Sequence, residues 1–180
     1  MKILPITPYD VVQHVLDGMV AAYGEKVALA DGREFVYAYW DGSDPGALAV
    51  GTPVWIGKVG KTTIANNPAI APCATNAVMQ DVGVAITTYT TAGGVWLQTK
   101  GWTTDTGKST GTGFCRLDGN ADITAGNQLQ GSNTYPTALV DDGGTALTAD
   151  SVGIAGESYA TNSTAGGKKV YLHGRRVTIG

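Results

Sequence analysis

Glycine is the feature of this sequence that most restricts the folds open to it. It occupies 26 of the 180 positions, about twice its usual share, and only 15% of the residues are charged. Gly and Thr are poor helix formers, while Glu and Lys, which favour helices, are scarce. The composition therefore predicts one domain of many short strands joined by tight turns. With 43% hydrophobic residues and a formal net charge of −3, we expect the chain to fold rather than stay disordered.

Charge and hydropathy also limit the partners. The sequence pI is near 5.2 and there is no basic tract, so nothing suggests nucleic-acid binding. The longest uncharged stretch, residues 62–80, contains Pro68 and Pro72 and several Asn and Thr residues, which does not predict a membrane span. The first ten residues lack an apolar core of signal-peptide length. We expect a protein made in the cytoplasm that binds neither nucleic acid nor membrane.

Helical periodicity is strong near the N-terminus. Thr7 is a suitable cap and Pro8 fits the first helical position. One apolar stripe follows, made of Val11, Val12, Val15, Leu16, Met19, Val20 and Tyr23. Before it, residues 1–6 form a short apolar arm for which the sequence implies no strand partner. These features predict an N-terminal arm and helix over residues 1–24 and a β-rich domain over residues 25–180.

Beyond the helix the pattern becomes that of strands. Alternating or β-branched runs predict strands at residues 34–40, 52–59, 82–91, 95–100, 114–117, 128–129, 138–139 and 152–154. Ala92-Gly93-Gly94 turns the chain between two of these runs, which predicts a hairpin. The expected fold is mainly β, an antiparallel barrel or sandwich-like domain carrying the N-terminal arm and one short helix.

One strand–turn–strand pattern occurs twice. Val82-Gly83-Val84-Ala85, followed by Tyr89 and Val95-Trp96-Leu97, is echoed about seventy residues later. The second copy is Val152-Gly153-Ile154-Ala155, followed by Tyr159 and Val170-Tyr171-Leu172. Either hairpins reuse the same residue types or one β-barrel contains a duplicated unit. Both explanations predict antiparallel strands.

Two stretches imitate a phosphate-binding loop, and neither has its spacing. Residues 57–62 contain Gly-Lys-Thr, but Trp55 occupies the position of the first glycine. Residues 107–109 are Gly-Lys-Ser, and there Trp102 occupies that position. The loop works through a fixed number of backbone amides around the phosphate, so neither stretch predicts a nucleotide site.

Metal binding and catalysis find little support. The soft ligands His14, His173, Cys73 and Cys115 lie far apart, without the short spacing of a zinc site. Asp41, Asp44, Asp141 and Asp142 are an alternative calcium cluster, although Asp-rich turns are common for conformational reasons alone. The two cysteines are expected to be small buried apolar residues. No serine has the surroundings of a nucleophile, which leaves a carboxylate pair as the open route to an enzyme. We expect no metal, no cofactor and no catalytic residues.

Aromatic residues are the best candidates for contacts with a partner. The chain has four Trp and eight Tyr, and such side chains dominate interface energetics. Trp40 and Trp55 lie in strand-like runs and are expected in the core. Trp102 follows a glycine and opens a Thr-rich loop, which predicts an exposed anchor. The apolar arm supplies the other candidate interface residues, Ile3, Leu4, Pro5 and Ile6.

Several segments resemble, in their order, those of small head proteins of tailed phages. LADGREFVY at residues 29–37 and GALAVGTPV at residues 46–54 are similar to two consecutive segments of that family. LDGNADITAGNQL at residues 117–129 is similar to a third. Residues 152–155 and 170–175 resemble the closing segment. Each motif alone consists of residues that are common in turns between strands, and it is the order of the motifs that is typical of the family.

The resemblance implies a capsid decoration, or cement, protein. Such proteins bind the outer face of an icosahedral head, often as homotrimers, and clamp neighbouring major capsid protein subunits. No catalytic residues come with the family. The implied location is the capsid surface of the virion, and the implied partners are the major capsid protein and further copies of the chain. The alternative is a tail or fibre component that binds host carbohydrate, with Trp102 stacked on a sugar.

Overall fold

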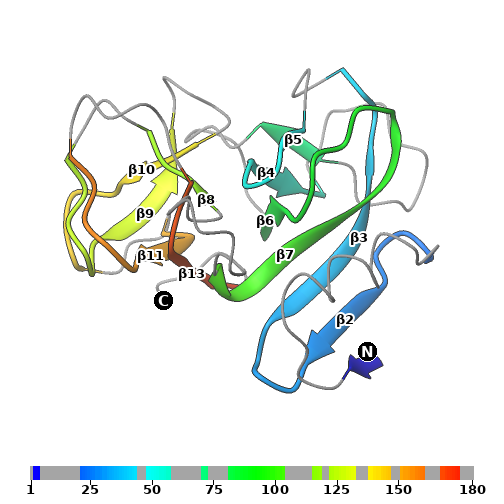
Figure 1. The fold of residues 1–180 in the computed structure, drawn as a ribbon, viewed down its shortest axis with the longest axis horizontal. Coiled ribbons are helices and arrows are strands. Elements are labelled where there is room, and N and C mark those ends of the chain that lie inside the picture. Colours follow the sequence, from blue (N-terminus) through cyan, green and yellow to red (C-terminus); the bar gives the residue numbers. More distant parts are fainter. Residues whose placement is uncertain are drawn as a thin grey trace.

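The computed structural model describes residues 2–4, 21–43, 48–57, 70–72, 81–103, 115–118, 122–132, 138–146, 151–160 and 167–174. These residues contain strands and no helix (Figure 1). The strands are β1 (Lys2–Leu4), β2 (Lys26–Leu29), β3 (Glu34–Trp40), β4 (Pro53–Ile56), β5 (Ile70–Pro72), β6 (Asp81–Ala85), β7 (Gly93–Thr103), β8 (Cys115–Arg116), β9 (Gln128–Gly131), β10 (Leu139–Asp141), β11 (Gly153–Ala155), β12 (Gly167–Lys168) and β13 (Val170–His173). The helix predicted after Thr7 lies outside the described residues, except that residues 23–24, where it would end, form a turn.

The strands form one large sheet and one small one. The main path is β1-β2-β3-β7-β13-β11-β9-β10, and β6 joins it at β7, with β4 and β5 beyond. All pairs are antiparallel except β1 with β2, and β8 pairs with β12 separately. Among the described strands the path has two free ends, so the sheet is not closed into a barrel. The prediction of a mainly β, antiparallel fold is confirmed, and of its two predicted forms the closed barrel is not the one found.

Strand β7 links the two halves of the sheet. Its middle residues pair with β6, and its last residues pair with β13. Figure 1 shows β4, β5 and β6 on one side of the molecule, and β9, β10, β11 and β13 on the other. The predicted hairpin is confirmed by the pairing of β6 with β7. β7 extends past the predicted end at residue 100 and carries Trp102 within the strand.

The N-terminal arm has a strand partner that the sequence did not imply. Residues 2–4 lie parallel to β2, with Ile3 opposite Ala28 and Leu4 opposite Leu29. A parallel pair between segments about 25 residues apart leaves no hairpin signal, because the connection is too long for a tight turn. The arm is therefore an edge strand of its own chain's sheet over these three residues.

The repeated pattern is a duplicated unit with a shared hydrogen-bond plan. In each copy a tight turn with glycine at positive φ, Gly51 (81°) or Gly126 (93°), is bonded to the end of the first strand of the pattern, β6 or β11, and to the segment that follows it. Each copy has the same five hydrogen bonds, all between 2.7 and 3.2 Å. In the first copy they are Thr52 N–Ala49 O, Gly51 N–Ala85 O, Ala85 N–Thr52 O, Tyr89 N–Leu48 O and Val50 N–Thr88 Oγ1. In the second copy, in the same order, they are Asn127 N–Thr124 O, Gly126 N–Ala155 O, Ala155 N–Asn127 O, Tyr159 N–Ile123 O and Ala125 N–Ser158 Oγ.

The strand registers repeat as well. Val54↔Gly83 in β4–β6 corresponds to Leu129↔Gly153 in β9–β11. Trp55↔Ala71 in β4–β5 corresponds to Gln130↔Val140 in β9–β10. Val84↔Gln98 in β6–β7 corresponds to Ile154↔Tyr171 in β11–β13. We call residues 48–56, 70–72, 83–89 and 97–101 unit 1, and residues 123–131, 139–141, 153–159 and 170–174 unit 2.

The structural equivalence differs from the sequence echo in one strand. The echo aligns Val170-Tyr171-Leu172 with Val95-Trp96-Leu97, whereas the pairing aligns it with Leu97-Gln98-Thr99. A shift of two residues keeps every side chain on the same face of a strand, so the hydrophobic pattern does not distinguish the two alignments. The positive φ of Gly101 (86°) and of Gly174 (89°) agrees with the alignment by pairing.

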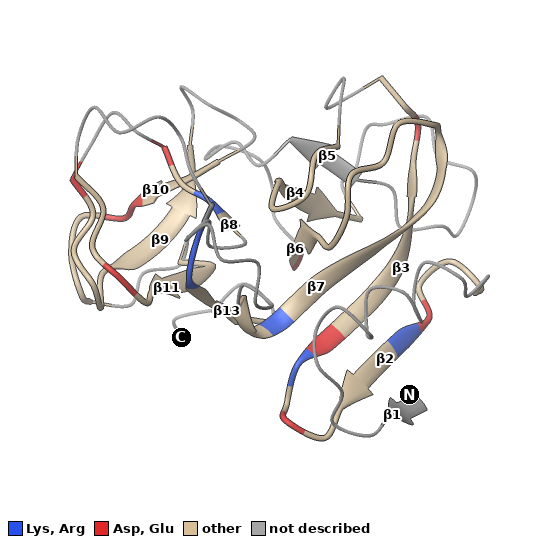
Figure 2. Ribbon diagram, viewed as in Figure 1, with Lys and Arg blue, Asp and Glu red and all other residues tan. Residues whose placement is uncertain are grey.

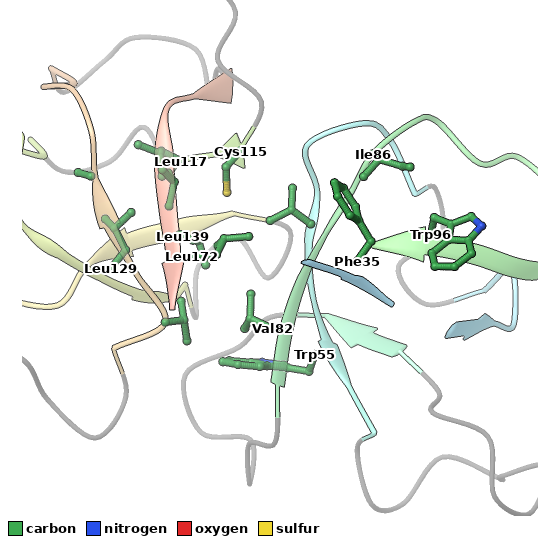
Figure 3. Packing of buried hydrophobic residues seen from close by; sticks show 14 of the residues in the cluster. Phe35, Trp55, Val82, Ile86, Trp96, Cys115, Leu117, Leu129, Leu139 and Leu172 are labelled. Carbon is green, nitrogen blue, oxygen red and sulfur yellow. The ribbon is translucent and has the colours of Figure 1, made fainter. Parts of the chain in front are cut away.

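Two clusters of buried side chains hold the fold together. One combines residues of β3, β4, β6 and β7 with residues of β8, β9, β10 and β13, as Figure 3 shows for Phe35, Trp55, Trp96, Leu129 and Leu172. The other lies on the opposite side of unit 1 and includes Trp40, Leu48, Val54 and Leu97. The prediction that Trp40 and Trp55 lie in the core is confirmed.

Candidate docking face

Trp102 is exposed, as the sequence predicted for this candidate interface residue. Its side chain is 40% exposed, and among the described residues Val50 is the other large hydrophobic one that is exposed. The ring meets Tyr171 of the neighbouring strand edge-on, with centroids 5.2 Å apart, and Lys169 Nζ lies 4.7 Å from the ring centroid. Gly156 leaves room for the ring, because a Cβ there would stand 2.7 Å from Trp102 Cζ3. The indole is thus held in a fixed place while part of it faces solvent.

The surface around Trp102 continues across the sheet. Trp102 lies opposite Tyr171, Tyr171 opposite Ile154, and Ile154 opposite Gln128, so these four side chains share one face. Two residues along the strands, the same face carries further partly exposed side chains. We call this surface the Trp102 face and define it by Trp102, Tyr171, Ile154, Gln130, Val140, Lys169 and His173.

The Trp102 face has few charges. Strands β9, β11 and β13 carry no Lys, Arg, Asp or Glu, as Figure 2 shows by their tan ribbons. Lys169 is exposed, and its backbone N–H donates to Glu157 Oε1 at 2.8 Å. Glu157 Oε2 also lies 4.0 Å from Lys168 Nζ. The face therefore presents apolar and amide groups around a lysine whose ammonium rests on an aromatic ring.

His173, on the Trp102 face, makes the stability of the fold depend on pH. Burial lowers the pKa of His173 below its ordinary value of 6.5, and its Nε2 lies 3.1 Å from Gln128 Oε1. The nearby charged group across the strand is Lys100, which is paired with Glu34. The folded state binds this proton more weakly than the unfolded chain does, so stability is full above about pH 6.5 and falls below it.

We expect His173→Gln to weaken that loss of stability on acidification, since Gln cannot take up the proton. Urea unfolding midpoints between about pH 5 and 8, compared between parent and variant, measure the difference. Equal slopes for the two proteins would contradict a role for His173 in the acid response.

The structure does not bring the two predicted interface regions together. Ile3 and Leu4 lie in β1, and β2 and β3 stand between β1 and β7 in the order of the sheet. Pro5 and Ile6 lie outside the described residues. Tyr171, Ile154 and Lys169 were missed as neighbours of Trp102, because they come from segments about 50 to 70 residues away. The alternation of Val170-Tyr171-Leu172 was the one signal that Tyr171 faces outward.

Cys115, Asp41 and Asp141, which the sequence offered as possible ligands, have roles in packing or in turns. Cys115 is fully buried, burial raises the pKa of its thiol, and it belongs to the larger core cluster. Asp41 accepts bonds from Ser43, and Asp141 accepts the N–H groups of Gly143 and Gly144, so both stabilise turns. Within the described part of the chain, no group of three or more His, Cys, Asp or Glu could hold a metal, and no helix could span a membrane. His14, Cys73 and Asp44 lie outside it.

Comparisons with known proteins give one structural likeness. No family model matches the sequence, and no curated protein matches it. Among solved structures, the chain is similar to the N base of the head fibre protein gp8.5 of bacteriophage phi29. The identity is 10% and the TM-score is 0.44, over 81% of this chain and 98% of that chain.

Proposed function

We propose that this chain is a structural protein of a tailed-phage head, which binds the outer surface of the capsid and stabilises contacts between major capsid protein subunits. The observation that carries the proposal is the Trp102 face, a sheet surface with few charges on which an exposed Trp lies beside a partly exposed Tyr. Aromatic residues are enriched and charged residues depleted at the centres of protein interfaces. The order of the sequence motifs resembles that of decoration proteins, and this supports the choice of that class of protein.

A decoration protein needs tight attachment from a small contact. We propose that the chain attaches as a homotrimer, so that three Trp102 faces engage neighbouring capsid subunits at once. Linked contacts gain avidity beyond the affinity of each one, because the second and third binding events are intramolecular. A head surface repeats the same subunit many times, which suits such a contact.

The N-terminal arm is the second proposed contact, through Ile3, Leu4, Pro5 and Ile6. We expect deletion of residues 1–6 to weaken attachment to heads while the β-domain stays folded, because β1 is a three-residue strand at the edge of the sheet. Co-sedimentation with heads measures attachment, and circular dichroism with a urea midpoint measures the fold. Undiminished attachment of the truncated protein would remove the arm from the proposal.

The function is tested by co-sedimentation of the purified chain with empty phage heads, with its mass in free solution measured by light scattering. The proposal predicts saturable binding at a fixed ratio to the major capsid protein. The proposed trimer predicts a mass three times the chain's 18.5 kDa. A chain that never sediments with heads, at any concentration tried, would overturn the proposal.

The alternative is a tail or fibre component that binds host carbohydrate. The exposed Trp102 ring also favours it, since Gln130 and His173 offer hydrogen-bonding groups on the same face. Lys169 stands over that ring, so a stacking sugar would have to compete with its ammonium. We prefer the protein contact for this reason. A glycan array read with the labelled chain tests the alternative directly.

A further inference from the structure

We infer that the Trp102 face is the open counterpart of a surface that unit 1 buries, and that its occupant is an apolar protein surface carrying a carboxylate opposite Lys169. The inference rests on the proposed function in taking that surface to belong to the capsid shell. It adds the chemistry of the contact and the residues that make it.

The equivalence of the two units assigns Trp102 a counterpart. In unit 1, Gln98 of β7 lies opposite Phe35 of β3. In unit 2, Tyr171 of β13 is the equivalent of Gln98, and it lies opposite Trp102 of β7. The end of β7 therefore pairs alongside unit 2 in the same way as the start of β3 pairs alongside unit 1. Trp102 occupies the place of Phe35, an aromatic residue with no exposed surface.

Five residues of unit 1 and its surroundings are more buried than their counterparts at unit 2. Phe35, Val84, Gln98, Trp55 and Trp96 are all buried, with exposed fractions of 2% or less. Their counterparts in unit 2 are Trp102, Ile154, Tyr171, Gln130 and Lys169, all exposed or partly exposed. Val82 and Val152, which are equivalent at the start of the repeated pattern, are buried alike. The two units thus have the same strand pairing, but the face of unit 1 is covered by other side chains and the equivalent face of unit 2 is open.

The covering of unit 1 shows what kind of surface such a face takes. Phe35, Trp55, Val84 and Trp96 form one continuous core with side chains of β8, β9, β10 and β13 (Figure 3). Those side chains are Cys115, Leu129, Leu139, Val170 and Leu172, joined by Leu117 just after β8, and they are apolar and mostly aliphatic. The face of unit 1 is therefore part of a core shared with aliphatic side chains on strands. An aliphatic surface on another protein would fit the Trp102 face in the same way.

Lys169 sets the charge of the occupant. It is the counterpart of Trp96, and its ammonium lies on the Trp102 ring. An ammonium taken from water without a partner is costly, so an occupant that covers it needs an acceptor, best a carboxylate. Glu157 is already bonded to the Lys169 backbone and faces Lys168. A second copy of the chain fits less well, because two such faces meeting around Trp102 would bring two Lys169 ammoniums together.

The test is co-sedimentation of the full-length chain with empty heads, for the parent and three variants. We expect Trp102→Ser to weaken binding about tenfold or more through loss of the central aromatic, and Lys169→Glu to weaken it about tenfold through charge reversal. Val50→Ser is the control, because Val50 is the other exposed large hydrophobic residue of the described part of the chain, at 44%, and is not one of the residues that define the Trp102 face. It should bind as the parent does. Urea midpoints check that each variant is folded, and light scattering gives each mass.

The outcomes separate the two proposals. If the parent does not bind heads, the proposed function fails and this inference fails with it. If the parent binds and Trp102→Ser or Lys169→Glu binds equally well, the function stands and the inference is overturned. If Trp102→Ser lowers the mass of the free protein to that of a monomer, the occupant is a second copy, which also overturns it. Loss of binding in both variants, with parent-like mass and parent-like binding of Val50→Ser, supports it.

Discussion

Replacing Trp96 with Ala is expected to lower the free energy of unfolding by about 3–5 kcal/mol, the range for removing a large aromatic side chain from a core. Trp96 is 1% exposed, and its ring lies 5.1 Å from that of Tyr37. Its strand is also fixed by Tyr89, whose hydroxyl accepts the Trp96 backbone N–H at 2.9 Å and donates to the Trp96 carbonyl oxygen at 3.2 Å. The cavity would open in the larger core cluster, which contains side chains from both units.

Trp102→Ala is the matched comparison for Trp96→Ala. It removes the same side chain from the same strand, yet Trp102 is 40% exposed. We expect a cost of about 1 kcal/mol, because the ring is only partly buried and its removal leaves no sealed cavity. Urea unfolding of both variants, with unchanged m-values, measures the two costs. Equal destabilisation by the two substitutions would contradict the assignment of Trp96 to the core and Trp102 to the surface.

The second large effect is expected at Gly153, where Ala should cost about 3 kcal/mol through overpacking. A Cβ at Gly153 would stand 2.6 Å from the carbonyl oxygen of Tyr171 and 3.0 Å from Val170 Cγ1. Tyr171 and Val170 belong to β13, which pairs with β11 at these positions. Backbone cannot move aside as a flexible side chain can, so the added methyl group would push β11 and β13 apart.

Gly126 serves as the control for Gly153→Ala, and Gly83 is its structural counterpart. Gly126→Ala meets no atom within 4 Å, but Gly126 has a φ of 93°, so strain alone should cost about 1 kcal/mol. Gly83 is the equivalent of Gly153 in unit 1, and a Cβ there would meet Leu97 Cβ and Ile56 Cδ1 at 2.8 Å each. Thermal or urea unfolding should rank Gly153→Ala as more harmful than Gly126→Ala. The reverse ranking would show that β11 and β13 are not packed as described.

The class of fold and its main hairpin could be predicted from local patterns. Alternation in residues 82–91 and 95–100, with Gly93-Gly94 between them, predicts the hairpin and which residues face inward. The position of its turn could not be predicted, because β6 already ends at Ala85 and Gly93-Gly94 belong to β7. The duplication could be suspected from repeated residue types such as Val-Gly-Val-Ala and Val-Gly-Ile-Ala. Its true register could not, because strands have a period of two and a shift of two residues preserves the pattern.

The candidate site could be predicted only in part. The exposure of Trp102 could be predicted from the Thr-rich sequence that follows it, although the residue itself lies inside a long strand. Its neighbours Tyr171, Ile154 and Lys169 depend on the pairing of β7 with β13 and of β13 with β11. Pairing between strands so distant in sequence is set by the whole fold and leaves no local signal. The same reason hid the parallel pairing of β1 with β2.

The most direct test of the account is hydroxyl-radical footprinting of the chain, free in solution and bound to empty phage heads. Trp102 and Tyr171 are open to solvent in the free chain and would be covered by the shell. Tyr39, which is partly exposed on β3, serves as the internal reference. The account predicts strong protection of Trp102 and Tyr171 on binding, with Tyr39 oxidised as before. Oxidation of Trp102 at the same rate in the bound and the free chain would contradict it.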